Sequence, residues 1–367
     1  MSLAMYKKEL QSLLQQKLKE CKVVVMPDFF LDRLINLNWD ATEFSNLIAN
    51  VAKRKGGSID GIHQADLPGG NAINVASALA NLDATVTPIV CTSEFGLQQI
   101  KYHFKNTPID TLHIKSRGKA SITTALEFKN KNEKANVMLR DLGALADFGP
   151  ANLDDSDYKI IDDADYVCLF NWAGTLKFGT KLAQAVFERT KQTGRGKTYY
   201  DTADPTPKAK TVPDLIDKVL KTNKVDILSL NENEAITYAS QLDHTLKEKK
   251  ESLGFAELAM EAARVLAKHL SARIDLHTTI FSATLKGKQE IVVPTFKVQV
   301  LRATGAGDAW NAGNILGDHN GLSDECRLMF ANAVAACYLS DPAGLHPTKD
   351  KLSLFIRNNA LGYAKLF

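Results

Sequence analysis

The most informative stretch of the sequence is a turn near its C-terminal end, which reads Thr304-Gly305-Ala306-Gly307-Asp308. The mostly apolar run Val298 to Arg302 before it predicts a strand, and Ala309 to Leu316 after it predicts a helix. Small residues at the start of a helix let backbone N–H groups converge on one point, where the helix dipole favours a bound anion. Phosphate is the anion that we expect there.

Asp308 is the residue of this turn that needs a reason, because a carboxylate repels a bound phosphate. One interpretation is an Asp in the first turn of the helix that opposes the helix dipole. The other is a general base, which takes a proton from a hydroxyl that attacks a phosphoryl group held by the neighbouring amides. An ordinary carboxylate pKa would suffice for that role, since the hydroxyl releases its proton late.

Two acidic residues, Asp28 and Asp32, follow the apolar segment Val23–Met26, which reads as a buried strand of a parallel sheet. Residues just past the C-terminal end of such a strand lie where open α/β sheets bind ligands. Each Asp therefore has two interpretations, a ligand-binding carboxylate or the cap of a local loop.

A second glycine turn, Gly69-Gly70, opens another predicted helix. Asn71 and Asn74 in its first turn offer both donors and acceptors, the combination that sugar hydroxyls require, although capping of the helix is the simpler role.

Asn231 and Glu234 stand where a later strand, Ile227–Leu230, passes into a helix. Their spacing suits a helix cap, and it equally suits a site that orders the water molecules around Mg²⁺.

The composition excludes some classes of function. The chain has 367 residues, 45 of them basic and 42 acidic, with no polybasic run, so nucleic-acid binding is not expected as its main role. No apolar run is long enough to span a membrane, and we expect no membrane partner. Five cysteines without a CxxC pair favour buried thiols in a reducing cytoplasm.

Strands alternate with helices after Gly143, which predicts an α/β fold whose mainly parallel sheet is covered on both faces. Two strand-like segments, Ile122–Phe128 and Asn136–Arg140, flank a polar loop and predict a hairpin that could serve as a lid. We therefore expect a main domain with lid insertions at 38–63 and 120–140. The main domain would comprise residues 5–37, 64–119 and 141–367.

The sequence resembles the ribokinase-like (PfkB) family of carbohydrate kinases. The resemblance lies in the order of the Asp after the first strand, the two glycine turns, and the motif Asn231-x-x-Glu234 between those turns. The resemblance runs from Val23 to about Pro347 and rests on residues 69–76 and on residues 305–308 followed by Gly313. It implies a three-layer α/β/α sandwich with a small β lid. It also implies a phosphotransferase that moves the γ-phosphoryl group of ATP to a sugar hydroxyl.

The resemblance also implies roles for individual residues. Asp308 would be the catalytic base, and the amides of Gly305, Ala306 and Gly307 would form the anion hole. The sugar would be bound by Asp32, Gly69, Gly70, Asn71 and Asn74. The nucleotide would be bound by Asn231, Glu234, Asn332 and Gly344, with Glu234 holding Mg²⁺ through water.

Three stretches depart from the family pattern. Arg302-Ala303 stands where relatives have Asp-Thr, which puts the usual monovalent cation in doubt. We hypothesise that the Arg302 guanidinium replaces the charge of that cation, and a strict requirement for K⁺ would contradict this. The other two departures are Thr92-Ser93-Glu94, where Gly-x-Asp is common, and Ser282-Ala283-Thr284, where a glycine usually borders the nucleotide.

Asn71 also bears on the substrate, because relatives that act on phosphorylated sugars often have lysine in its place. A neutral amide cannot neutralise a phosphate, so an unphosphorylated sugar is favoured. Lys208 or Arg140 could still supply charge. The sequence does not place either of them.

Two alternatives stay open. A nucleoside kinase of the same family would stack a base on aromatic residues such as Phe29, Phe30, Phe170 and Trp172, which are also suited to the core. A sugar-binding sensor without catalysis would explain the altered nucleotide edge. A homodimer through the lid is a further expectation.

Overall fold

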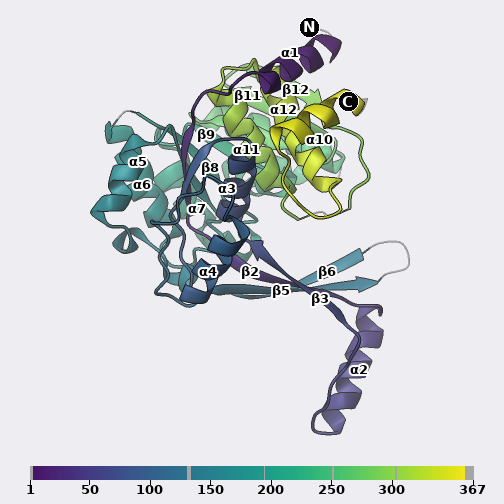
Figure 1. Cartoon of the computed structure of the whole chain (residues 1–367). Helices are drawn as coiled ribbons and strands as arrows, with labels where there is room; N and C mark the ends of the chain where they lie inside the picture. The colour runs from purple at the N-terminus through teal and green to yellow at the C-terminus, as the bar shows by residue number, and fades with distance from the viewer. Residues whose placement is uncertain (1–2, 130–133, 194, 250–251, 302–303, 360–367) are drawn as a thin grey trace.

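The computed structural model describes residues 3–129, 134–193, 195–249, 252–301 and 304–359. Within these residues the strands form two separate sheets (Figure 1). The larger sheet has the order β12-β11-β10-β9-β8-β7-β1-β4. Its strands are β1 (Lys22–Met26), β4 (Thr85–Pro88), β7 (Tyr166–Phe170), β8 (Lys197–Asp201), β9 (Ile227–Leu230), β10 (Arg273–His277), β11 (Phe281–Lys286) and β12 (Gln289–Pro294).

This sheet is parallel from β4 across to β10, and its last two strands run antiparallel. Strand β7 shows why the central strands form, since all five residues of its apolar run are buried. Such continuous apolar strands are typical of a sheet that is covered on both faces. The parallel strands therefore end at one common edge, where the polar residues predicted to bind ligands follow them.

Helices cover both faces of the larger sheet. One core is built with α1 (Leu3–Gln15), α3 (Asn71–Asn81), α11 (Ala306–His319), α12 (Asp324–Leu339) and α13 (Lys349–Asn358). The other core is built with α5 (Asp155–Asp163), α6 (Gly179–Thr193), α7 (Val212–Leu215), α8 (Glu232–Leu242) and α10 (Phe255–His269). Two further helices are α4 (Glu94–His103) and the short α9 (Thr245–Lys249). The expected three-layer α/β/α arrangement is confirmed.

The smaller sheet has the order β3-β2-β5-β6 and projects from one end of the larger layers (Figure 1). It contains β2 (Phe30–Asn36), β3 (His63–Gly69), β5 (Ser121–Lys129) and β6 (Lys134–Asp141). The antiparallel pair β5 and β6 is the hairpin predicted from the sequence. Strands β2 and β3 also belong to this sheet, although they lie largely in segments that the sequence analysis placed in the main domain.

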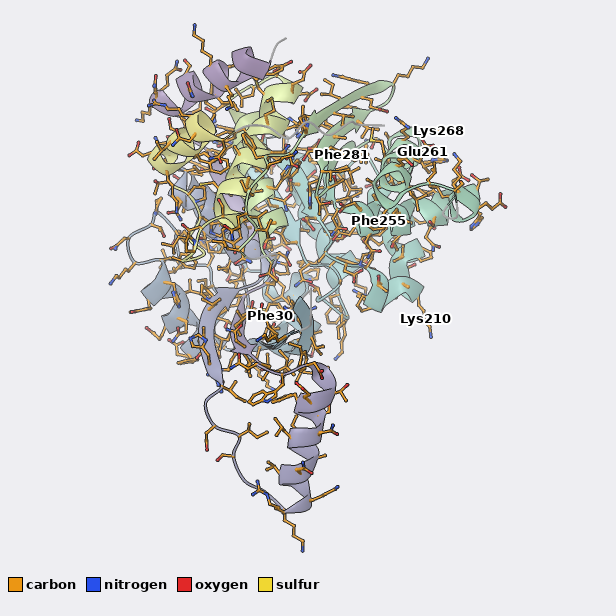
Figure 2. All side chains as sticks on the ribbon, turned by 90° about the vertical axis from the view of Figure 1, so that its right-hand side faces the viewer. Phe30, Lys210, Phe255, Glu261, Lys268 and Phe281 are labelled. Carbon is orange, nitrogen blue, oxygen red and sulfur yellow. The ribbon has the colours of Figure 1, made fainter. Side chains whose placement is uncertain are left out.

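Helix α2 (Ala41–Lys53) joins β2 to β3 and stands clear of the rest of the protein in both views (Figures 1 and 2). Asp40 caps it, with its carboxylate accepting from the amides of Thr42 and Glu43. None of its residues is buried. Phe30, at the start of β2, lies where the small sheet meets the body of the protein (Figure 2).

One predicted strand is wrong. Residues 298–301 form no strand, and Arg302 lies outside the described residues. The alternating apolar residues have another use, because Val298 and Val300 line a large pocket instead of pairing with a neighbouring strand. The amide of Leu301 bonds to the carbonyl of Leu339 at the end of α12. No helix in the described part of the chain is long and apolar enough to cross a membrane.

Candidate active site

The N-terminus of α11 borders a pocket of about 960 Å³ at the carboxyl edge of the larger sheet. Gly305 precedes the helix with a positive φ of 83°, and a Cβ on it would lie 2.7 Å from the hydroxyl oxygen of Tyr338. Only glycine meets both conditions. Gly305, Ala306 and Gly307 line the pocket, and no side chain of the described residues caps the helix. The first-turn amides therefore remain available to an anion.

Asp308 is the third residue of α11 and lines the same pocket, although only 4% of its surface is exposed. Its two carboxylate oxygens accept hydrogen bonds from the side-chain amides of Asn71 and Asn74, each at 2.8 Å. Burial raises the pKa of Asp308 to about 7, because the hydrogen bonds from the two side-chain amides do not offset the loss of hydration. The pKa of Asp308 therefore lies above the ordinary carboxylate value that would suffice for a base. At neutral pH this carboxyl is poised between its two protonation states.

The N-terminus of α3 differs from that of α11, because a carboxylate of the protein already occupies it. Asp28 accepts hydrogen bonds from the backbone amides of Asn71 and Ala72, both at 2.9 Å, and from the side chain of Asn171 at 2.8 Å. Burial raises the pKa of Asp28, and these bonds oppose that shift. The structure thus gives Asp28 the capping role that the sequence left open.

Gly69 and Gly70 shape the second glycine turn around two acidic residues. Gly70 has a φ of 99°, and a Cβ on it would lie 3.0 Å from the carbonyl oxygen of Asp28. A Cβ on Gly69 would lie 1.9 Å from a carboxylate oxygen of Asp32. The two glycines therefore make room for both carboxylates.

Asp32 lies on β2 in register with Thr123 on β5, which in turn is in register with Arg140 on β6. Thr123 donates a hydrogen bond to the Asp32 carboxylate. The buried oxygen Oδ1 of Asp32 has no partner among the described residues. Burial raises the pKa of Asp32 to about 6. A buried acceptor without a donor is costly unless a ligand supplies one, and a sugar hydroxyl is a suitable donor.

Asn231 and Glu234 form a capping box at the start of α8. The Glu234 carboxylate accepts from the backbone and side-chain amides of Asn231, at 2.9 and 2.8 Å, and the Asn231 side chain accepts from the Glu234 amide. Both residues line the pocket. Burial, and then the nearby Asp201 carboxylate, raise the pKa of Glu234 well above its usual value. A cation would relieve this repulsion, so the pair fits Mg²⁺ as well as a cap.

The two remaining nucleotide residues differ in position. Asn332 lines the pocket, but its side chain is already engaged by Trp310, Ser282 and the carbonyl of Pro294. Gly344 lies in the turn after α12 and outside the set of residues that line the pocket.

The basic residues considered for the substrate are placed differently from each other. The Lys208 ammonium donates to the carbonyls of Trp172 and Thr175, so it is held by the protein itself. The Arg140 guanidinium lies 5.0 Å above the Phe30 ring and acts electrostatically on Asp28 and Asp32.

Aromatic residues that could have stacked on a base are instead in the core. Phe29, Phe30, Phe170 and Trp172 each expose 3% of their surface or less. This removes the observation on which the nucleoside alternative rested in the sequence.

Two residues of the pocket escaped sequence reasoning. Asp201 ends β8 and is held by the Asn311 side chain, and His277 ends β10 beside Gly307. Both stand at the C-terminal end of a parallel strand, which is the signal that could have identified them.

Known structures share this architecture. The chain matches ribokinase from Thermotoga maritima with a TM-score of 0.66 and 16% identity, covering 93% of this chain and 100% of the other. It matches Arabidopsis thaliana ribokinase complexed with ribose and ATP with a TM-score of 0.68 and 16% identity, covering 92% and 99%. Adenosine kinase from Sinorhizobium meliloti gives 0.68 and 17%, covering 92% and 99%. No curated protein matches the sequence.

Residues 38–350 match the model of the pfkB family carbohydrate kinases. The fold is thus ribokinase-like, with a pocket at the carboxyl edge of its sheet. The chain belongs to the pfkB family of carbohydrate kinases, as the two glycine turns indicated.

Proposed function

We propose that this protein transfers the γ-phosphoryl group of ATP to a hydroxyl of an unphosphorylated sugar, with Asp308 as the base. The observation that carries the proposal is the uncapped N-terminus of α11 with a buried, poised carboxyl in its first turn. An anion site and a proton acceptor lie within one helical turn. Phosphoryl transfer to an alcohol requires both.

The first step is positioning of the acceptor. Asp32 offers a sugar hydroxyl an acceptor oxygen that has no partner among the described residues. Asn71 and Asn74 fix the direction of the Asp308 carboxylate. Orientation of this kind contributes much of the rate enhancement in bimolecular transfers. The reacting hydroxyl then lies against Asp308.

The second step is transfer. The amides of Ala306 and Gly307 hold the phosphoryl group while charge develops on its oxygens, and Asp308 accepts the hydroxyl proton. A carboxyl with a pKa of about 7 is half deprotonated at neutral pH, so it serves as a base without a large energetic cost.

ATP and Mg²⁺ fit the pocket by the chemistry of its walls. The volume of about 960 Å³ lies at the upper end of the usual range for ligand sites. The buried Asp201 carboxyl raises the pKa of Glu234, so a bound cation would favour the ionised form of Glu234, which is our candidate to hold Mg²⁺ through water. Bound Mg²⁺ would neutralise charge on the phosphate oxygens. ATP is present in the Arabidopsis thaliana ribokinase structure, and ATP with Mg²⁺ in one of a putative ribokinase II from E. coli.

The preference for an unphosphorylated sugar rests on the charge around Asp32. Asn71 places a neutral amide at the site, and the Lys208 ammonium already donates to backbone carbonyls of the protein. Arg140 is the basic group that acts on Asp32, and it is partly balanced by Asp28 and Asp32 themselves. The hypothesis that Arg302 replaces a monovalent cation concerns a residue outside the described part of the chain.

The experiment that tests the proposal is a phosphoryl-transfer screen with Mg-ATP over sugars and nucleosides, in which ADP release is measured. We expect turnover with an unphosphorylated sugar. Turnover with a nucleoside alone would favour the nucleoside kinase. Ligand binding without any transfer would favour the sugar-binding sensor.

The small sheet is our candidate for a lid and for a dimer interface. Its face opposite Asp32 carries Ile122, Val137 and Leu139, each at least 40% exposed. Exposed apolar residues that share a face are typical of an interaction surface. A dimeric mass in solution, lost on Leu139→Asp, would support a homodimer through this face. A cytoplasmic location stays an expectation.

A further inference from the structure

His277 is a residue of the pocket that the proposed mechanism does not use. It ends β10, and its imidazole packs beside the anion hole, because a Cβ on Gly307 would lie 3.2 Å from its Cε1 atom. The ring also packs against Trp310 in a tilted arrangement, with centroids 5.0 Å apart and an interplanar angle of 36°. His277 thereby lies against the helix that would hold the transferred phosphoryl group, and Thr278–Ile280, which follow it in the chain, also line the pocket.

One nitrogen of the imidazole, Nε2, is buried and has no hydrogen-bond partner among the described residues. A buried polar nitrogen of this kind is costly unless something satisfies it. The cost is borne next to an anion site, which suggests that a ligand supplies the partner.

The charges around His277 explain why an imidazole suits this position. Burial lowers its pKa to about 4, although the carboxylates of Glu232 on α8 and Asp275 on β10 act in the opposite direction. The ring is therefore neutral at pH 7. The pocket is also lined by Asp201, Asp204, Glu234, Asp308 and Lys297. A lysine or arginine at this point would pair with these carboxylates, whereas a neutral imidazole keeps its N–H donor free for an incoming phosphate.

We propose that His277 is a phosphate ligand of the nucleotide, donating its imidazole N–H to the phosphate chain beside the amides of α11. The inference rests on the proposed function and adds a residue to it. His277 would favour ligands that carry phosphate over the bare nucleoside.

The test compares two variants by calorimetric titration with MgADP and with adenosine. His277→Phe keeps the packing against Trp310 and removes the donor, whereas His277→Gln keeps an N–H donor. We expect His277→Phe to weaken MgADP binding by about 10- to 100-fold and to leave adenosine binding unchanged. His277→Gln should recover most of the affinity for MgADP.

The opposite results are equally clear. Wild-type affinity for MgADP in His277→Phe would overturn the inference and leave the proposed function standing. An equal loss of MgADP and adenosine binding in both variants would show a structural role and would also overturn it. If the wild-type protein bound no MgADP at all, the proposed function and the inference would both fail.

Discussion

The N-termini of α3 and α11 begin with the same device, a glycine in a conformation with positive φ, yet the protein uses them differently. At α3 the carboxylate of Asp28 bonds to the first two amides, so the end is closed by the protein. At α11 no described side chain takes that place, and the end opens into the pocket. A glycine turn before a helix therefore indicates an anion site, and the fold decides whether the anion is internal or a ligand.

The two ends are also connected. The backbone amide of Asn71 donates to Asp28, and its side-chain amide donates to Asp308. The closed end, at α3, therefore orients the carboxyl of the open end, at α11. Asp28 is thus engaged at the closed end, whereas Asp308, held by Asn71 and Asn74, is the carboxyl that we propose acts on a substrate. Substitutions at the two ends should have different consequences.

The largest effect is expected for Asp308→Asn. This variant loses the proton acceptor, so we expect kcat to fall by at least about 1,000-fold. The melting temperature should change little, because a buried charge is removed while one hydrogen bond is lost. Steady-state kinetics with the sugar identified in the transfer screen would measure the effect. A kcat within tenfold of wild type would show that Asp308 is not the base.

Asp28→Ala should act mainly on stability. It leaves two backbone amides and the Asn171 side chain without their acceptor in a buried site, which we expect to cost about 3 kcal/mol in the free energy of unfolding. Urea denaturation measures this directly. Asp40→Ala, at the exposed cap of α2, is the matched control and should cost about 1 kcal/mol. Equal losses in the two variants would contradict the closed-end role of Asp28.

The dependence of kcat/KM on pH follows from the raised pKa of Asp308. A base is active when deprotonated, so the rate should be constant above the pKa of about 7 and fall about tenfold per pH unit below it. Protonation of Asp32, with its pKa of about 6, should steepen the fall at lower pH. A profile that stays flat down to pH 5 would show that Asp308 titrates at an ordinary value in the working enzyme.

The smallest effect is expected for Gly305→Ala. Its Cβ would meet the Tyr338 hydroxyl in a backbone conformation that side chains disfavour, so the first turn of α11 must shift. We expect kcat to drop about tenfold, with a smaller change in stability. Gly70→Ala is its counterpart at the closed end and should instead lower stability. Reversal of this pattern would break the distinction between the two ends.

The sequence predicted most of the architecture, because the pattern of buried strands and capped helices is local. Strand β7 and helix α6 belong to the alternation predicted after Gly143, since an unbroken apolar run and an amphipathic repeat do not depend on distant residues. Val298–Leu301 shows the limit, because its apolar alternation serves the wall of a pocket. Periodicity identifies a covered face without showing what covers it.

The site was predictable in its residue types and less so in its energetics. Asp308, Asn71 and Asn74 were expected near one another, and the structure places both amides 2.8 Å from the carboxylate. The capping role of Asp28 depends on contact between residues far apart in sequence. The raised pKa of Asp308 depends on burial, and the contact of His277 with Trp310 depends on the packing of β10 against α11. None of these is a local property of the chain.

The most direct test of the open end is a crystal structure with ADP, aluminium fluoride, Mg²⁺ and the sugar accepted in the transfer screen. We predict that the fluoride group, as a mimic of the phosphoryl group in transfer, is bound by the amides of Ala306 and Gly307. The reacting sugar hydroxyl should lie within hydrogen-bond distance of Asp308. A fluoride group bound elsewhere in the pocket, or a sugar hydroxyl out of reach of Asp308, would contradict the account.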